Sequence, residues 1–328
     1  MRSRDDRRSG RGHIDWLTLV VLAGCYILWA TSLTLYALTG WWPVLAATVY
    51  SVTLHSSLQH EALHGHPTRR AFLNELLVFP ALGLYIPYRR FRATHLRHHC
   101  DERLTDPYDD PESWYVSCED WRHRGRVMRL LLTFNTTLAG RLLIGPALGV
   151  FGLWRHDLSG LRNGEHFVAK AYLLHFAGAL PVVVASQALA GINPLVYALA
   201  IAYPAMSLLM VRTFAEHRPK RDPHQRSVII ETSPFFSLLF LNNNLHYAHH
   251  KWPTKPWYRL GADYRAEKDR LLRENGGYRF DGYLALFRRH LFHRVGPVVH
   301  PHFRRDEITG TAASPARRVA RVGFGRPG

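Results

Sequence analysis

Four long apolar stretches, arranged in two closely spaced pairs, dominate the pattern of hydrophobic and polar positions along the chain. The first pair covers residues 16–38 and 41–57, and the second covers residues 171–190 and 192–211. The first stretch contains no charged residue and exceeds the roughly 20 apolar residues that an α-helix needs to cross a bilayer. Because very few residues separate the members of each pair, each pair predicts a helical hairpin in a membrane.

Two further hydrophobic segments have features that argue against a crossing. Residues 72–88 are too few for a span and are interrupted by two prolines, so we expect an interfacial or re-entrant element there. Residues 127–154 contain Arg129 and Arg141, and an arginine within a span is costly in lipid. We expect this segment to form an amphipathic helix that lies on the membrane. The predicted fold is all-α and integral to the membrane, with four transmembrane helices as two hairpins plus interfacial helices and a cytoplasmic histidine-rich cap.

Basic residues gather on one side of the predicted spans. They precede the first span, follow the second and fourth, and are absent from both hairpin tips, which is the positive-inside pattern. Both termini and the long connections are therefore expected in the cytoplasm. A formal net charge of +17 would suggest nucleic-acid binding in a soluble protein, but this topology accounts for the charge and excludes that class. The asymmetry rests on Arg2, Arg4, Arg7, Arg8, Arg11, Arg69, Arg70, Arg212, Arg218, Lys220 and Arg221.

The two ends of the chain differ in composition from its middle. Residues 1–13 are charged and contain Ser and Gly, while residues 301–328 are rich in Arg, Ala, Gly and Pro, so both segments are predicted to be basic and disordered. Residues 14–300 then form one membrane domain. The first apolar stretch is too long for a secretory signal peptide and a second span follows at once, so no cleavage is expected.

Three histidine clusters occur on the predicted cytoplasmic side of the spans. Residues 95–99 have the spacing H-x-x-H-H, residues 246–250 repeat it, and residues 60–64 hold a pair at i and i+4. On a helix such positions share one face, so the three imidazoles of each H-x-x-H-H run are expected to converge on a single point, where they favour a metal. With a further histidine after the fourth span, the candidate ligands are His60, His64, His95, His98, His99, His217, His246, His249 and His250.

The number of candidate ligands indicates two metal ions. Zinc sites take about four ligands and octahedral ions about six, so the nine histidines exceed what one ion accepts. Imidazole suits iron, copper, nickel and zinc about equally, and the spacing alone does not identify the metal. An isolated histidine in such a chain is often an interfacial residue, and for His217 this alternative stays open.

The order of the clusters and span pairs resembles that of the membrane fatty acid desaturase and hydroxylase superfamily, which includes carotenoid hydroxylases and ketolases. The resemblance covers residues 16–260. It implies a non-haem centre of two iron ions, held by histidines on the cytoplasmic face of a four-span bundle, with dioxygen as co-substrate for oxidation of an unactivated C–H bond. It also implies that His217 supplies an additional ligand. Candidates for groups that orient the ligand imidazoles are Asp106, Glu216, Asn243 and Asn244, although Asp106 is equally a turn residue before Pro107.

The resemblance implies an oxidoreductase, and we expect it to desaturate a fatty acyl chain of a membrane lipid. A lipid or carotenoid hydroxylase or ketolase with the same iron site is the alternative. A metal transporter is disfavoured, because the spans lack ionisable ligands near the bilayer midplane.

Oxidation of a C–H bond by dioxygen needs electrons from another source. The chain has no dinucleotide-binding motif and no clustered cysteines, so we expect a separate donor such as a ferredoxin or cytochrome b5. Arginines near the second cluster offer a docking surface for an acidic partner, or else hold the cap against anionic lipid. The expected location is the inner or plasma membrane of a bacterium. These arginines are Arg89, Arg90, Arg92, Arg97, Arg122, Arg124, Arg126 and Arg129.

Overall fold

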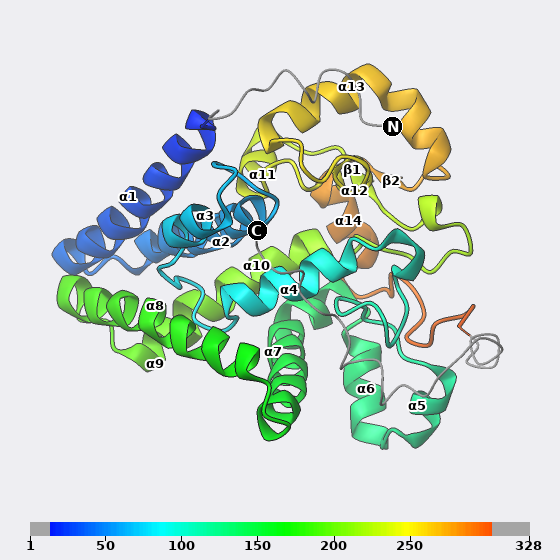
Figure 1. Cartoon of the computed structure of the whole chain (residues 1–328), viewed down its shortest axis with the longest axis horizontal. Helices are drawn as coiled ribbons and strands as arrows, with labels where there is room; N and C mark the ends of the chain where they lie inside the picture. The colour runs from blue at the N-terminus through cyan, green and yellow to red at the C-terminus, as the bar shows by residue number, and fades with distance from the viewer. Residues whose placement is uncertain (1–13, 304–328) are drawn as a thin grey trace, which may run out of the picture.

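The computed structural model describes residues 14–303, and this part of the chain is predominantly helical (Figure 1). The terminal segments 1–13 and 304–328, for which the sequence predicts disorder, lie outside the described residues. In Figure 1 the long apolar helices α1 (Trp16–Thr39) and α8 (His166–Ala190) lie toward the left, and α13 (Trp257–Glu274), from the last third of the chain, lies at the upper right.

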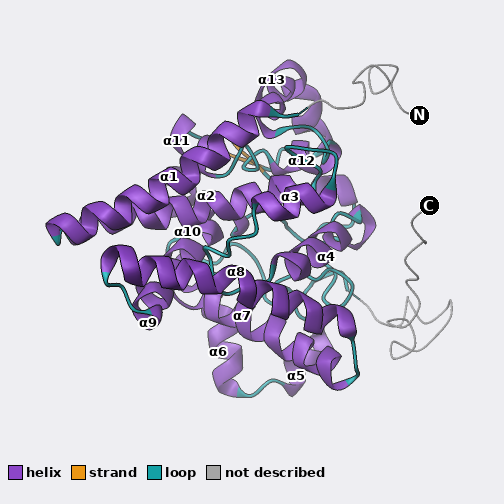
Figure 2. Ribbon diagram, turned by 60° about the vertical axis from the view of Figure 1, so that its left-hand side comes forward, coloured by secondary structure: helices purple, strands orange, loops and turns teal. Residues whose placement is uncertain are grey.

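The first predicted hairpin is formed by α1 (Trp16–Thr39) and α2 (Leu45–Leu63), which run side by side (Figure 2). Asp15 begins α1 by accepting a hydrogen bond from the backbone N–H of Thr18, and Gly40 ends it in the left-handed conformation with φ of 64°. A short 3₁₀ helix (Trp42–Val44) leads into α2. Sequence and structure therefore agree on a tight turn between these two helices.

The second predicted hairpin is formed by α8 (His166–Ala190) and a composite helix. Gly191 ends α8 with φ of 66°, and α9 (Pro194–Tyr197) continues through a π-helical turn (Ala198–Ala202) into α10 (Tyr203–Thr213). Proline at the first position of α9 fits a helix start, because that position needs no N–H donor.

Three helical segments of the described chain are long and apolar enough to cross a membrane, namely Trp16–Thr39, His166–Ala190 and Pro194–Thr213. The fourth expected span, α2, is not among them, because it carries buried polar residues such as Thr48, Ser51 and His55. Large apolar side chains on the outer faces of α1 and α8, including Ile27 and Leu173, are exposed as lipid-facing residues would be. The structure thus supports a membrane protein, and four crossings remain a prediction.

The segment expected to form one interfacial helix consists of two. Helix α6 (Arg126–Phe134) ends before Thr137, whose side chain caps α7 (Leu138–Arg162) by accepting from the N–H of Gly140. Arg141 is buried inside the protein. The helices between α2 and α6 are short, as the prolines predict: α3 (Ala71–Leu77), α4 (Tyr88–His98), a 3₁₀ turn (Asp101–Arg103) and α5 (Cys118–His123).

The last third of the chain contacts the ends of α2 and α4 through His249. Two short strands, β1 (Ile229–Ile230) and β2 (Arg279–Phe280), pair in parallel, and the segment from β1 to α12 (His246–Lys251) passes through Leu241 and Asn242 with φ of 48° and 56°. These left-handed residues turn the chain so that α12 enters the protein interior, where Tyr247 and Ala248 are buried. The other elements of this part of the chain are a 3₁₀ turn (Pro223–Gln225), α11 (Pro234–Leu239), α13 and α14 (Gly282–His290).

Candidate metal centre

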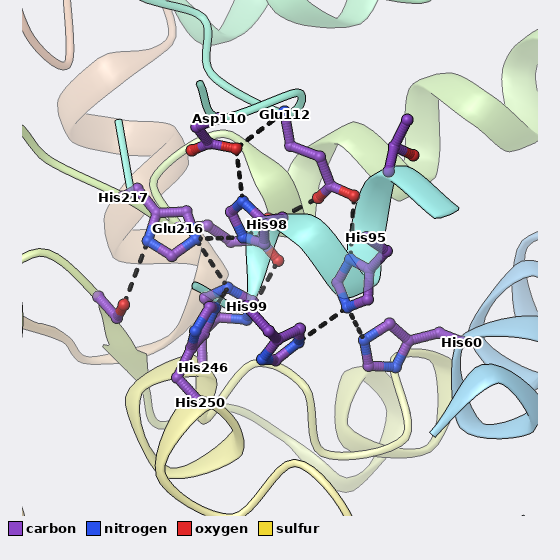
Figure 3. A network of polar contacts seen from close by, with 12 residues as sticks. His60, His95, His98, His99, Asp110, Glu112, Glu216, His217, His246 and His250 are labelled. Atoms are coloured by element: carbon purple, nitrogen blue, oxygen red, sulfur yellow. Dashed lines mark hydrogen bonds and ion pairs between the residues drawn. The ribbon is translucent and has the colours of Figure 1, made fainter. Parts of the chain in front are cut away.

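The predicted ligands come from four segments that meet in the protein interior (Figure 3). The first cluster lies at the end of α2 and the second at the end of α4, where His64 and His99 occupy the C-cap positions. The third cluster forms α12, and His217 follows α10 in a segment that bridges to Ser227. The ends of α2 and α4, together with α12 and the segment after α10, therefore bring together histidines that are far apart in sequence.

Five histidines form one group whose ligand atoms all lie within 4.8 Å of one another, and we call it the five-histidine site. The Nε2 atoms of His60 and His95 are 2.9 Å apart, and those of His95 and His99 are 3.0 Å apart. Nε2 of His249 lies 3.1 Å from that of His99. The members of the site are His60, His64, His95, His99 and His249.

The remaining four candidate ligands form a second group under the same limit of 4.8 Å, which we call the four-histidine site. Nε2 of His217 lies 2.9 Å from Nε2 of His98 and 3.0 Å from Nε2 of His246. Nε2 of His250 lies 3.0 Å from that of His246. His217 therefore lies among the cluster histidines rather than at the interface that the alternative predicted.

Each H-x-x-H-H run divides between the two sites, which corrects the expectation that its three rings converge on one point. In the second cluster, His95 and His99 reach the five-histidine site while His98 reaches the four-histidine site. In the third cluster, His246 and His250 reach the four-histidine site while His249 reaches the five-histidine site. Successive helical residues are about 100° apart, so positions i+3 and i+4 lie on opposite sides of position i and diverge.

The contacts of Nδ1 in His98 and His95 show which nitrogen of each ring carries the proton when the ring is neutral. Nδ1 of His98 lies 2.8 Å from Asp110 Oδ1, and Nδ1 of His95 lies 2.9 Å from Glu112 Oε1 (Figure 3). Burial alone would raise the pKa of Glu112, but His95 and His98 hold it below its usual range, so this carboxylate is ionised and only accepts hydrogen bonds. Each Nδ1 therefore donates its proton, and in the neutral ring Nε2 presents a lone pair.

Lone pairs that face one another at these distances repel unless a cation lies between them. Two nitrogens bound at right angles to one ion at about 2.1 Å lie about 3.0 Å apart, which agrees with the distances in both sites. In addition, Nε2 of His64 is buried and has no hydrogen-bond partner within the described chain. The donor set therefore fits two ions, one in each site.

Burial sets the protonation of most of these rings. It lowers the pKa of His217 and His246 well below the ordinary value, which keeps them in the neutral form that binds metal. His98 is different: burial lowers its pKa, but the carboxylates of Glu112 and Asp110 outweigh this effect and raise the pKa to about 9. A proton on His98 is thus the cation that competes with a metal in the four-histidine site.

The four residues predicted to orient ligands take different places. Asn243 contacts Nδ1 of His246 through Oδ1 at 2.9 Å, and Glu216 lies 3.5 Å from the same nitrogen. Asn244 instead donates to the backbone oxygen of Ile230 at 2.7 Å and so ties the third cluster to β1. Asp106 accepts from the backbone of the turn that follows it, as its alternative interpretation predicts.

The carboxylates that contact the second cluster are Asp110 and Glu112, which the sequence analysis did not select. Both belong to the acidic, turn-rich segment after the cluster, where Asp110 precedes a proline and reads as a helix breaker. Ser227, whose hydroxyl lies 3.1 Å from Nδ1 of His217, was missed as well. The useful signal was the number of acidic residues directly after a histidine run, since ligand histidines usually bond to a carboxylate.

A cavity of about 720 Å³ adjoins both sites. His60 of the five-histidine site and His98 and His217 of the four-histidine site lie in its wall, and α7 and α10 add apolar residues that include Leu148 and Met206. Its size falls within the range of roughly 300–1,000 Å³ that is usual for ligand pockets. A ligand in this cavity would therefore lie against both groups of histidines.

These features define a class: a helical, membrane-compatible protein with two adjoining histidine sites suited to metal ions. The family model described as fatty acid desaturase matches residues 38–282, which is most of the chain and contains all three histidine clusters. The chain therefore belongs to the fatty acid desaturase family, whose members are typically oxygen-dependent membrane oxidoreductases of the desaturase or hydroxylase type. No curated protein matches the chain.

Proposed function

We propose that this protein is an oxygen-dependent membrane oxidoreductase that desaturates a fatty acyl chain of a lipid. The observation that carries the proposal is the convergence of two histidine sites on the wall of one cavity. Family membership supports the same chemistry. Iron is the metal we propose for both sites, because imidazole accepts several metals and the family match favours iron among them.

Three groups of residues have different roles in the proposed reaction. The two histidine sites would hold the ions, which when bound would supply the activation of dioxygen. Asp110 and Glu112 hold the Nδ1 protons of His98 and His95 and so fix the orientation of both rings. The apolar part of the cavity wall holds the acyl chain and excludes water from the reacting carbons.

The overall reaction balances with an external donor. Two hydrogens leave adjacent carbons of the chain, and together with two electrons and two protons from outside they reduce one dioxygen to two waters. The donor we propose is an acidic protein such as a ferredoxin or a cytochrome b5. Of the arginines expected to receive it, Arg89 pairs with Glu75 at 2.6 Å and Arg97 pairs with Asp109 at 3.3 Å. Arg92 of α4, Arg122 of α5 and Arg126 of α6 are exposed and are therefore the stronger candidates for docking.

The experiment that tests the proposal is expression with a donor and its reductase, followed by mass spectrometry of the host lipids. The expected product is two hydrogens lighter than its substrate. A product that gains an oxygen atom without new unsaturation would replace the desaturase with the hydroxylase alternative. Turnover that does not change between low and high salt would contradict electrostatic docking of the donor.

The proposed location is the inner membrane of a bacterium, with both termini in the cytoplasm. The arginine asymmetry along the sequence supports this orientation. Reporter fusions at each terminus test it, and a C-terminal reporter that is active only on the far side of the membrane would refute it. Elemental analysis tests the metal: two irons per chain are expected, and one zinc without iron contradicts the proposal.

A further inference from the structure

Arg141 is a buried cation in the wall of the cavity. Its residue is 3% exposed, and its Nε donates to the backbone oxygen of Asn135 at 3.3 Å. The ring of Trp114 lies 4.0 Å from the centre of its guanidinium group and covers one face of it. Nη1 is buried and has no hydrogen-bond partner within residues 14–303. One N–H edge of this arginine is therefore available to a ligand.

The other arginines in the cavity wall each form an ion pair with a carboxylate. Arg90 pairs with Asp157 at 2.6 Å, Arg97 pairs with Asp109, and Arg212 pairs with Glu216 at 2.7 Å. No ion pair joins Arg141 to a carboxylate among the described residues, and Glu216, whose charge acts on Arg141, is already paired with Arg212. A buried charge without a counter-ion destabilises a protein, so its presence in a ligand cavity indicates that the ligand supplies the counter-ion.

The local sequence makes room for this side chain. Gly145 follows Arg141 by one helical turn in α7, and a Cβ atom at that position would lie 2.8 Å from Cδ of Arg141 and 2.6 Å from Sδ of Met210. Any larger residue would push the arginine from its place. The helix thus has a glycine where an interior position ordinarily favours a better helix former.

We propose that Arg141 binds the anionic head group of a single-chain lipid, a carboxylate or a phosphate, whose hydrocarbon chain occupies the same cavity. This inference rests on the proposed function, since it names the substrate class of that site. The planar guanidinium can form two parallel hydrogen bonds to such an oxyanion. The cavity also contains His217 of the four-histidine site, so the anchored head group sets which carbon of the chain lies beside the histidines.

The test measures binding without turnover. Purified full-length, metal-loaded protein is kept anaerobic and without donor, and the dissociation constants of oleate, oleoyl lysophosphatidate and oleyl alcohol are measured. Three variants are compared with the native chain: Arg141→Met, Arg141→Lys and Arg155→Gln. Arg155 is an exposed arginine of the same helix that does not line the cavity, so it controls for loss of positive charge on α7.

Arg141→Met is expected to weaken binding of at least one of the two anionic lipids by about 10- to 100-fold and to leave oleyl alcohol within about twofold. The anionic lipid with the larger loss identifies the head group. Arg141→Lys is expected to lose less, because it keeps the charge but not the two parallel hydrogen bonds. Arg155→Gln is expected to bind all three lipids as the native chain does.

The melting temperature separates ligand binding by Arg141 from a purely structural role. If Arg141 binds a ligand, the melting temperature of Arg141→Met without ligand should equal or exceed that of the native protein, because an unpaired buried charge has been removed. A lower melting temperature with equal losses for all three lipids would overturn the inference, as would unchanged binding of both anions. If the binding pattern is as expected but no acyl lipid is oxidised, the proposed function is wrong and the inference that Arg141 binds the head group is supported. If acyl lipids are desaturated but Arg141→Met binds both anionic lipids normally, only the inference about Arg141 is wrong.

Discussion

The two histidine sites lie side by side, yet they are built differently. In the four-histidine site, the second ring nitrogen of three ligands contacts a defined partner: Asp110, Ser227 or Asn243. The five-histidine site has one more ligand, and its carboxylate contact is that of His95 with Glu112. One site therefore relies on fewer but individually oriented rings, and the other on a larger number of rings. The two should respond differently when a ligand, a proton or a partner is changed.

The largest expected difference follows loss of a ligand. His217→Ala or His246→Ala leaves three histidines in the four-histidine site, so this site should lose its ion and the protein its activity, while the chain stays folded. His64→Ala leaves four histidines in the five-histidine site, and this site should keep an ion. Elemental analysis of the purified variants is expected to give about one metal per chain in the first case and about two in the second.

The exposed residue His293 supplies the control, because His293→Ala should change neither metal content nor turnover. Near-normal activity of His217→Ala would show that His217 is not a required metal ligand. Equal metal loss from His64→Ala and His246→Ala would show that the two sites are not distinct in the way that their ligand numbers suggest.

The next difference concerns pH. The pKa of His98 is raised to about 9, whereas burial lowers the pKa of His99 and His249 in the five-histidine site below the ordinary value. A metal must displace the proton of His98 at any pH below about 9, so each unit of acidification should weaken metal binding to the four-histidine site about tenfold. From pH 9 to pH 7 the expected loss is therefore about 100-fold, and the five-histidine site should change little.

Titration of the metal-free protein with metal at several pH values checks this prediction. Two classes of affinity should separate as pH falls, since only one of them loses strength between pH 9 and pH 7. Parallel loss in both classes, or none in either, would contradict the difference in protonation between the two sites.

A smaller effect is expected from the carboxylate of the four-histidine site. Asp110→Asn removes the charge that holds the Nδ1 proton of His98 while preserving shape, and it should weaken metal binding to that site by about 10- to 100-fold. The five-histidine site should keep its affinity. Asp109→Asn is the matched control, since Asp109 pairs with Arg97 near the surface and not with a ligand. Equal losses from both variants would show a general effect of charge.

These differences also separate what the sequence could predict from what it could not. Helical spacing identified the clusters because i and i+4 positions are a local property of a helix, and His95 and His99 do share a site. Which site takes His98 depends on where α12 and the segment after α10 lie, which is a tertiary property. Asp110 and Glu112 reach the histidines through an irregular turn, and irregular backbone has no periodicity from which to infer direction.

The fold shows the same division. Hydropathy alone predicted α1, α8 and the composite helix of α9 and α10, because a lipid-facing helix must be apolar on its outside. It could not place Arg141, which looked like a surface residue in a hydrophobic segment and is instead enclosed between Trp114 and the cavity. An arginine inside the protein and one at a membrane surface give the same sequence pattern.

The smallest expected effect comes from Ser227, a neutral partner in the four-histidine site. Its hydroxyl lies 3.1 Å from Nδ1 of His217 and is the acceptor when that nitrogen carries the proton, as binding of a metal at Nε2 requires. A neutral hydrogen bond contributes about 1 kcal/mol, so Ser227→Ala should weaken metal binding to this site about fivefold, well below the loss expected for Asp110→Asn. Ser113→Ala, which removes a hydroxyl that bonds to the backbone of Thr105, is the matched control and should leave both affinities unchanged. Metal titration checks the ranking. A loss from Ser227→Ala as large as that from Asp110→Asn would mean that position of the ring, and not charge on its partner, governs this site.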